Sequence, residues 1–115
     1  MIEEALQACM DRHLAHAAMM HRLDDDLGAH HGLSWADFVL LTALDAASEA
    51  TPAKELARTL CMPASQLLLR LLPLEKIGLV ERAADSNGKR CVKLRPQGRR
   101  LLREARDTAQ NACVR

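Results

Sequence analysis

Positively charged side chains are concentrated in the second half of the chain, where they could bind a polyanion. Residues 1–50 carry nine Asp/Glu against two Lys/Arg, whereas residues 51–115 carry six against fourteen. The positive charge is densest in a stretch with these nine basic residues: Arg82, Lys89, Arg90, Lys93, Arg95, Arg99, Arg100, Arg103 and Arg106. A cationic segment of this kind is typical of a surface that binds nucleic acid. The alternative interpretation is a solvated helix with an arginine-rich face.

The cysteines offer one candidate for redox chemistry. Cys9, Cys61, Cys91 and Cys113 are far apart and include no C-x-x-C pair, so neither a zinc finger nor a disulfide framework is indicated. Cys9 is a candidate redox-sensing thiol. A reactive thiolate needs positive charge nearby, which Arg12 and the neighbouring histidines could supply. The alternative is a buried, inert cysteine.

All five histidines lie between residues 13 and 31. His13 and His16 are one helical turn apart, which makes a regulatory metal site conceivable. No cysteine or pair of carboxylates lies close by on the same helix face, however, so the ligand spacing is weak. We therefore predict no metal and no cofactor, and expect the histidines to pack at a dimer interface or to line a ligand cleft.

The sequence shows no catalytic residues. It has no Gly-rich phosphate loop and no nucleophile with an identifiable base. The run Asp24-Asp25-Asp26 lies at the end of a predicted helix and is interpreted as a solvated acidic cluster, not as paired catalytic carboxylates. We therefore expect a binding protein and not an enzyme.

Length and composition predict a single, mainly helical domain. A chain of 115 residues is large enough for one core. Apolar residues make up 49% of it, but with one Phe, one Trp and no Tyr the core must consist mostly of Leu, Ala, Met and Val, which favours helices. No stretch is apolar enough for a membrane span, and the acidic N-terminus lacks the basic start of a secretion signal. We expect a cytoplasmic protein.

A long first helix is predicted over residues 2–27, ending at Gly28 and Gly32. Its apolar residues lie on more than one side, so we expect two packing partners, the protein's own core and a second subunit. The residues predicted to contribute to a homodimer interface come from this helix and from the last one: Leu6, Met10, Leu14, Leu101 and Ala105.

Three further helices form the outline of a helix-turn-helix. Ser34 is the predicted N-cap of a helix whose inner face carries Trp35, Phe38, Leu41 and Leu44, and which stops between Ser48 and Thr51. Thr51 then caps a short helix with Pro52 in its first position, spanning Ala53–Leu60. A tight turn leads into a helix that begins at Pro63, with Leu67, Leu71 and Leu74 inward.

A β-hairpin and a final helix complete the predicted fold. Gly78 ends the fourth helix, and Leu79 and Val80 open a strand. The turn Asp85-Ser86-Asn87-Gly88 connects it to a second strand, Cys91–Leu94, because Asn-Gly between apolar runs is a strong hairpin signal. Pro96 starts a helix to about Cys113, and its inward residues are Leu101, Leu102, Ala105, Ala109 and Ala112.

Several motifs between residues 33 and 102 are informative when taken together. They are Leu33-Ser34-Trp35-Ala36-Asp37-Phe38-Val39-Leu40-Leu41, Glu55-Leu56-Ala57, Ser65, Leu74-Glu75-x-x-Gly78-Leu79-Val80-x-Arg82, Asp85 to Arg90, and Leu94-x-Pro96-x-Gly98. This set resembles the winged helix-turn-helix regulators of the MarR (multiple antibiotic resistance) family. The resemblance implies a winged helix-turn-helix that is mainly α with a small β-hairpin wing and dimeric through its terminal helices.

The resemblance also implies a function. Such a protein is a homodimeric bacterial transcription factor, most often a repressor, that binds a pseudo-palindromic site in double-stranded DNA and is relieved by a small molecule or an oxidant. Within the single domain 1–115, it assigns dimerisation to 1–27, DNA binding to 33–95 and a C-terminal helix to 96–113. The expected DNA-binding residues are Ser65, Gln66, Arg70 and Lys76 in the fourth helix and Arg82, Lys89, Arg90 and Lys93 in the wing.

The fourth helix departs from the family pattern. Its outer face presents Leu69, Leu72 and Pro73, with few side chains that could hydrogen-bond to base edges. We therefore expect few hydrogen bonds to base edges and an affinity that depends on phosphate contacts and on salt concentration. Pro73 predicts a kink or a short final turn. The apolar face also permits an alternative function, in which the domain binds a protein partner instead of DNA.

Overall fold

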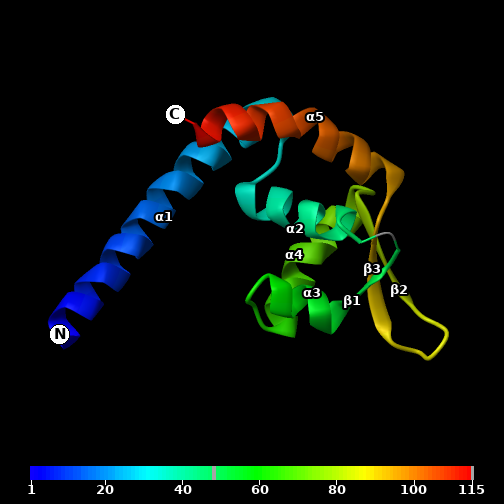
Figure 1. Cartoon of the computed structure of the whole chain (residues 1–115). Coiled ribbons are helices and arrows are strands. Elements are labelled where there is room, and N and C mark those ends of the chain that lie inside the picture. Colours follow the sequence, from blue (N-terminus) through cyan, green and yellow to red (C-terminus); the bar gives the residue numbers. More distant parts are fainter. Residues whose placement is uncertain (48, 115) are drawn as a thin grey trace. The chain divides into compact units, whose positions relative to one another are not determined.

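The computed structural model describes residues 1–47 and 49–114 and shows the five predicted helices and the predicted hairpin in the expected order, with one additional short strand (Figure 1). The elements are α1 (Ile2–His31), α2 (Trp35–Asp45), β1 (Thr51–Pro52), α3 (Ala53–Thr59), α4 (Ala64–Lys76), β2 (Val80–Ala84), β3 (Arg90–Leu94) and α5 (Pro96–Cys113). They form two compact units, Met1–Trp35 with the chain from Ala105 onwards, and Ala36–Glu104. In the described part of the chain, no helix is both long and apolar enough to span a membrane.

The first helix is four residues longer than predicted. Gly28 was expected to end it, but Gly28 lies within α1, which continues to His31. Gly32 ends the helix with a φ of 68°, and its N–H donates to the Gly28 carbonyl at 3.2 Å while Leu33 N–H donates to the Leu27 carbonyl at 3.3 Å. This pair of hydrogen bonds is the usual way in which a glycine in the left-handed region closes a helix.

In the first unit, the end of α1 packs with the end of α5. The buried residues are Leu23, Leu27, Leu33, Ala105, Ala109 and Ala112. Two hydrogen bonds join the helices: Arg22 Nε donates to the Ala112 carbonyl at 3.1 Å, and His31 Nε2 lies 2.8 Å from Thr108 Oγ1. The small alanine side chains of α5 allow α1 to approach closely. Aliphatic contacts between the two helices therefore stabilise this unit.

The start of α2 is fixed by an aspartate that the sequence analysis interpreted differently. The backbone N–H of Trp35 donates to Asp24 Oδ1 at 2.6 Å. The prediction of a solvated cluster is therefore wrong for Asp24, because its carboxylate caps an N–H group that has no partner within the helix. Farther along α2, Leu41 and Leu44 are buried as predicted together with Leu40, whereas Trp35 and Phe38 are half-buried. Ser48 lies outside the described residues, and α2 already ends at Asp45.

In the second unit, α3 and α4 form the predicted helix-turn-helix. The chain reverses at Cys61, whose φ of 56° lies in the left-handed region. The turn is closed by Met62 N–H, which donates to the Ala57 carbonyl at 3.0 Å. The three leucines predicted to point inward, Leu67, Leu71 and Leu74, are buried. The turn and the leucine face together position α4.

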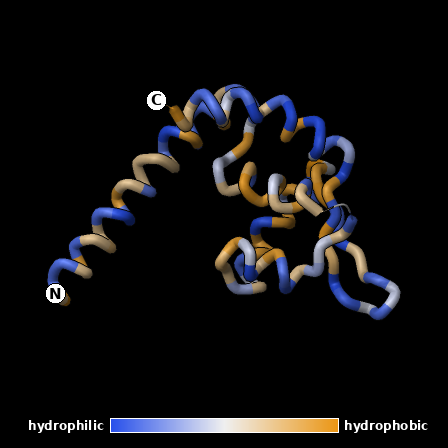
Figure 2. The backbone as a smooth tube through the Cα atoms, viewed as in Figure 1, coloured by the Kyte–Doolittle hydropathy of each residue, from blue (hydrophilic) through white to orange (hydrophobic). Residues whose placement is uncertain are grey.

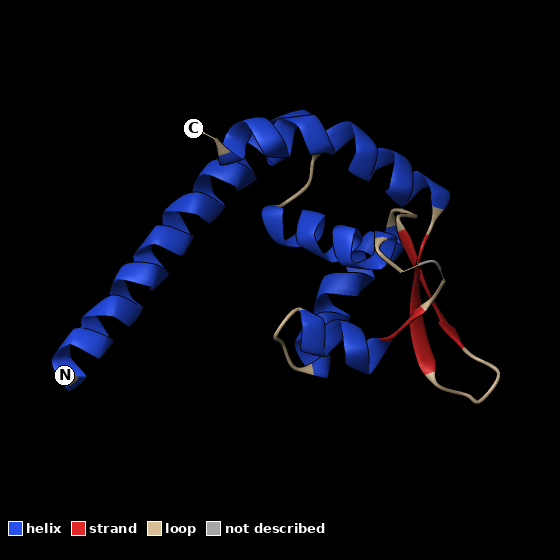
Figure 3. Ribbon diagram, in the orientation of Figure 1, coloured by secondary structure: helices blue, strands red, loops and turns tan. Residues whose placement is uncertain are grey.

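The wing is a three-stranded antiparallel sheet in the order β1-β3-β2 (Figure 3). The predicted hairpin is present, with Val80 opposite Leu94 and Ala84 opposite Arg90. The prediction missed β1: residues Thr51 and Pro52, expected to cap and begin a helix, pair with Val92 and Cys91 instead. The helix α3 begins at Ala53 as predicted, with Pro52 as its N-cap residue, and ends at Thr59, one residue before the predicted end.

Gly98 marks the closest approach between α5 and the sheet. A Cβ at this position would collide with the Leu79 carbonyl and lie 2.7 Å from Leu94 Cδ1. Arg95 N–H donates to the same Leu79 carbonyl at 2.9 Å. The first turn of α5 therefore lies directly against the ends of β2 and β3, and only a residue without a side chain fits there.

Candidate nucleic-acid interface

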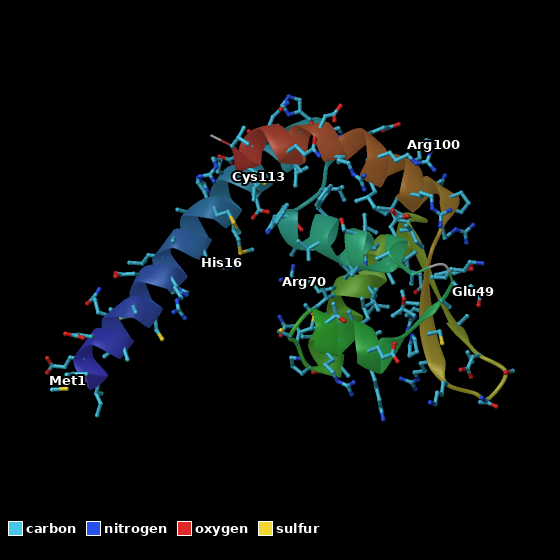
Figure 4. The ribbon with its side chains drawn as sticks, in the orientation of Figure 1. Met1, His16, Glu49, Arg70, Arg100 and Cys113 are labelled. Carbon is cyan, nitrogen blue, oxygen red and sulfur yellow. The ribbon has the colours of Figure 1, made fainter. Side chains whose placement is uncertain are left out.

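The outer face of α4 carries the polar residues that the sequence analysis assigned to base contacts. Ser65, Gln66, Arg70 and Lys76 are all exposed, and Figure 4 shows Arg70 on this helix. They lie within the thirteen residues of a helix that follows a tight turn, which is the arrangement of the recognition helix in helix-turn-helix proteins. The amide and hydroxyl of Gln66 and Ser65 could hydrogen-bond to base edges, while Arg70 and Lys76 could reach phosphates.

The same face carries an apolar surface, here called the leucine strip, made of Leu68, Leu69 and Leu72. Their exposed fractions are 38%, 70% and 41%. At 100° per residue, Leu69 lies opposite the buried Leu67 and Leu71, which explains its larger exposure. The apolar outer face predicted from the sequence is thus present.

Pro73 lies within α4, and the helix continues for three residues after it. Ile77 N–H still donates to the Pro73 carbonyl at 3.2 Å. Because proline has no N–H, the Leu69 carbonyl loses its helical donor. The helix nevertheless continues through Pro73 to Lys76, with one intrahelical hydrogen bond missing at the Leu69 carbonyl.

An ion pair joins α4 to the wing. Arg82 Nε and Nη2 donate to Glu75 Oε1 at 3.1 and 3.0 Å, and the backbone N–H of Arg82 donates to Glu75 Oε2 at 3.3 Å. The side-chain hydrogen bond from Arg82 lowers the pKa of Glu75, aided by the backbone N–H and the positive charge and opposed by partial burial. Arg82, expected to be a DNA-binding residue, is thus engaged within the protein and positions β2 against α4.

The hairpin turn presents two cations. Asp85 Oδ1 accepts hydrogen bonds from Asn87 N–H at 2.8 Å and from Lys89 N–H at 2.9 Å, which fixes the turn. The side chains of Lys89, Arg90 and Lys93 are exposed, and none of them has a hydrogen bond or ion pair within residues 1–47 and 49–114. A narrow two-stranded ribbon with free cations at its end suits the minor groove, where the negative potential is greatest.

The other arginines of the cationic segment differ in their contacts. Arg95 pairs with Glu81 at 3.4 Å, and Arg99 pairs with Asp45 at 3.3 Å. Arg100, Arg103 and Arg106 of α5 are exposed, and Figure 4 shows Arg100 on this helix. Part of the positive charge noted in the sequence is therefore neutralised by local ion pairs, and the wing retains cations without such partners.

The cysteines and histidines differ in their exposure and in their contacts. Cys9, Cys61 and Cys113 are exposed, and Cys91 is buried. No group of three potential metal ligands is found among residues 1–47 and 49–114. His30 Nδ1 lies 2.9 Å from the Asp26 carbonyl, and His31 contacts α5 as described above, so these two histidines have structural contacts.

Comparison with known proteins places this arrangement among transcriptional regulators. No protein-family model and no curated protein matches the chain, whereas many solved structures do. The transcriptional regulator BldR from Sulfolobus solfataricus has 28% identity and a TM-score of 0.84 over 96% of this chain and 79% of its own. A probable transcriptional regulator from Pseudomonas aeruginosa has 25% identity and a TM-score of 0.82 over 92% and 79%.

A third structure was solved with nucleic acid. The MarR family regulator Sco3205 from Streptomyces coelicolor, in complex with DNA, has 23% identity and a TM-score of 0.86 over 98% of this chain and 72% of its own. These structures confirm the winged-helix fold and the resemblance to the MarR family that the sequence motifs indicated.

Proposed function

We propose that this chain, which has the winged helix-turn-helix fold of the MarR-family regulators, is a DNA-binding transcriptional regulator. The observation that carries the proposal is one compact unit in which an exposed helix-turn-helix face and a cationic hairpin tip are joined by the Glu75–Arg82 ion pair. The solved neighbours are regulators of the same fold, which also agrees with the absence of predicted catalytic residues.

Phosphate contacts are expected to supply most of the affinity. Five exposed cations on α4 and the wing have no ion pair within residues 1–47 and 49–114: Arg70, Lys76, Lys89, Arg90 and Lys93. Each phosphate that they neutralise releases a condensed counterion, so the logarithm of the binding constant falls with the logarithm of salt by about 0.9 per contact. Two polar groups near the start of α4, Ser65 and Gln66, are few for hydrogen-bonded base readout, so binding should weaken steeply with salt.

A homodimer is part of the proposal because α1 lacks a packing partner over more than half its length. All residues before Met19 are exposed, including Leu6, Met10 and Leu14 at 61%, 50% and 63%. Figure 2 shows apolar positions recurring along this part of the helix. A single projecting helix gains no stability from burial, and its apolar stripe is suited to a second copy. Leu101 is half-buried, whereas Ala105 is buried within its own subunit and is not free to contact a partner.

Two bound copies would place two recognition helices on one duplex, so the preferred site is a pseudo-palindrome. The test is selection of duplexes from a random-sequence pool by the purified full chain, followed by anisotropy titration at two salt concentrations. Enrichment of an inverted repeat with a steep salt dependence supports the proposal. Weak binding at low salt without any enriched sequence overturns it.

The wing provides the specific variant for this test. Lys89→Ala combined with Arg90→Ala should reduce the salt slope by about 2 per protomer and weaken binding to all sequences alike. Arg100→Ala combined with Arg103→Ala removes the same charge from α5 and serves as the control. If both double variants lose affinity equally, net charge and not the wing determines binding.

A second candidate function is favoured by the exposure of the leucine strip. A winged-helix domain with this apolar face could bind another protein. Leu69→Glu should abolish such a partnership, while the wing double variant should weaken DNA binding and leave the partnership intact. A partnership that survives the wing double variant but not Leu69→Glu identifies a protein as the occupant of the leucine strip.

A further inference from the structure

The leucine strip occupies the part of α4 that the proposed function places at the bases. In a helix-turn-helix the N-terminal part of the recognition helix contacts base edges in the major groove. Leu69 is the sixth residue of α4, lies on its outward face and is 70% exposed. Gln66 precedes it by three residues and Ser65 by four, so all three share this face. A leucine therefore stands where base-reading side chains usually stand.

The major groove offers one apolar group to such a side chain. Guanine presents two acceptors, cytosine a donor and adenine one of each, whereas thymine presents an acceptor and a 5-methyl group. Leu69 can neither donate nor accept a hydrogen bond. Held against a G·C pair, it would remove water from polar edges without replacing the lost hydrogen bonds, which is unfavourable. Against thymine it covers a methyl group instead.

We propose that Leu69 is a specificity-determining residue that reads the thymine 5-methyl group, so that each half-site carries thymine at the contacted position. The inference rests on the proposed DNA-binding function and deepens it. Leu68 and Leu72 lie beside Leu69, both toward the same edge of the face, and are less exposed; we expect them to exclude water from the contact. Gln66, one turn away, is placed to accept and donate hydrogen bonds at a neighbouring adenine.

The surroundings of the strip favour DNA over a protein as its occupant. Arg70 follows Leu69 directly, and Lys76 lies on the same face of α4 farther along. The wing, with three unpaired cations, is fixed to α4 by the Glu75–Arg82 hydrogen bonds. Protein interfaces bury about 800 Å² per partner and are depleted of lysine at their centres. Three leucines on two turns of one helix, bordered by cations, match a groove that is lined by phosphates.

Removal of single methyl groups tests this inference without changing any hydrogen bond. In the best duplex from the random-pool selection, each dT is replaced in turn by dU, which keeps base pairing and the hydrogen-bonding groups of both groove edges but lacks the 5-methyl group. Affinity of the full chain is measured by anisotropy. We expect a loss of about fourfold at the contacted dT, equivalent to about 0.8 kcal/mol for one buried carbon, and about 15-fold when both half-sites are changed.

The Leu69→Ala variant, combined with the dU duplex, tests whether Leu69 is the side chain that contacts the methyl group. It should bind the dT duplex more weakly than the original protein but lose nothing further on dU substitution, because the side chain that contacted the methyl group is absent. Alanine favours helix and the position is exposed, so folding should be retained. Ile77→Ala is the control: Ile77 follows α4 and is 62% exposed, and its removal should leave the dU effect unchanged.

The outcomes separate the inference from the function on which it rests. Specific DNA binding without any dU effect, or with the same effect in Leu69→Ala, overturns the reading of thymine and leaves the DNA-binding function in place. Failure to enrich any duplex overturns both and points to a protein as the occupant of the leucine strip.

Discussion

Some residues act by positioning the elements of the proposed DNA-binding interface and not by contacting DNA. Glu75 is one example, because it accepts three hydrogen bonds from Arg82 and thereby joins the end of α4 to the start of the wing. Asp24 is another, because its carboxylate accepts the first N–H of α2. Neither residue had a role in the predicted site, yet each determines where a functional element begins.

The Glu75–Arg82 pair predicts a pH-dependent stability. The pKa of Glu75 is lowered in the folded protein, so its stabilisation is present above the unfolded pKa of about 4.3 and is lost as the pH falls through the folded value. Glu75→Gln should therefore be less stable than the original protein at neutral pH, with the difference closing in acid. Urea denaturation between pH 7 and pH 3 measures it; Glu104→Gln is the exposed control. A gap that persists at pH 3 would contradict the role of the charge.

At the scale of elements, the sequence predicted the elements that have local signals and missed the strand that depends on pairing with a distant segment. The helices follow from aliphatic periodicity, and the hairpin follows from Asn87-Gly88, which are local signals. Strand β1 has two residues whose pairing partners lie in β3, so no periodicity could reveal it. Arg82 on β2 donates hydrogen bonds to Glu75 near the end of α4. Both residues belong to one sequence motif, but the motif gave no sign that they are in contact.

Glycines within helices illustrate the same difference between local and tertiary determinants. Gly98→Ala should destabilise the protein by about 2–3 kcal/mol, because the new Cβ would meet the Leu79 carbonyl. Gly28→Ala should instead stabilise it by about 0.5–1 kcal/mol, since the nearest atom to a Cβ in this helical position is the Leu33 carbonyl oxygen at 4.0 Å. Thermal and urea unfolding of the two variants compare these opposite signs, and equal shifts would show that helix propensity alone governs both sites.

At the scale of the whole molecule, oligomerisation determines whether the proposed interface can read an inverted repeat. One helix-turn-helix contacts one half-site, and the second requires a partner copy. The exposed stripe of α1 is the feature that supports such a copy. Its contribution can be separated from DNA contacts, because residues 1–18 carry none of the proposed DNA-binding side chains.

Charges placed in the α1 stripe should dissociate the dimer. Leu6→Glu combined with Leu14→Glu would place two carboxylates in an apolar contact, and sedimentation should then show a monomer that binds the inverted repeat at least tenfold more weakly. The control, Ala8→Glu combined with Ala15→Glu, adds the same charge on the opposite side of the helix. A dimer that survives the first double variant would place the subunit contact elsewhere.

The backbone contact between Trp35 and Asp24 has an optical consequence. Trp35 is the single tryptophan and the chain has no tyrosine, so the intrinsic emission of the protein arises from one half-buried indole at the start of α2. The backbone N–H of the same residue, Trp35, donates a hydrogen bond to the Asp24 carboxylate of α1. Any event that breaks this hydrogen bond changes the surroundings of the only tryptophan. The fluorescence of Trp35 therefore reports, without an added label, whether the connection between α1 and α2 is intact.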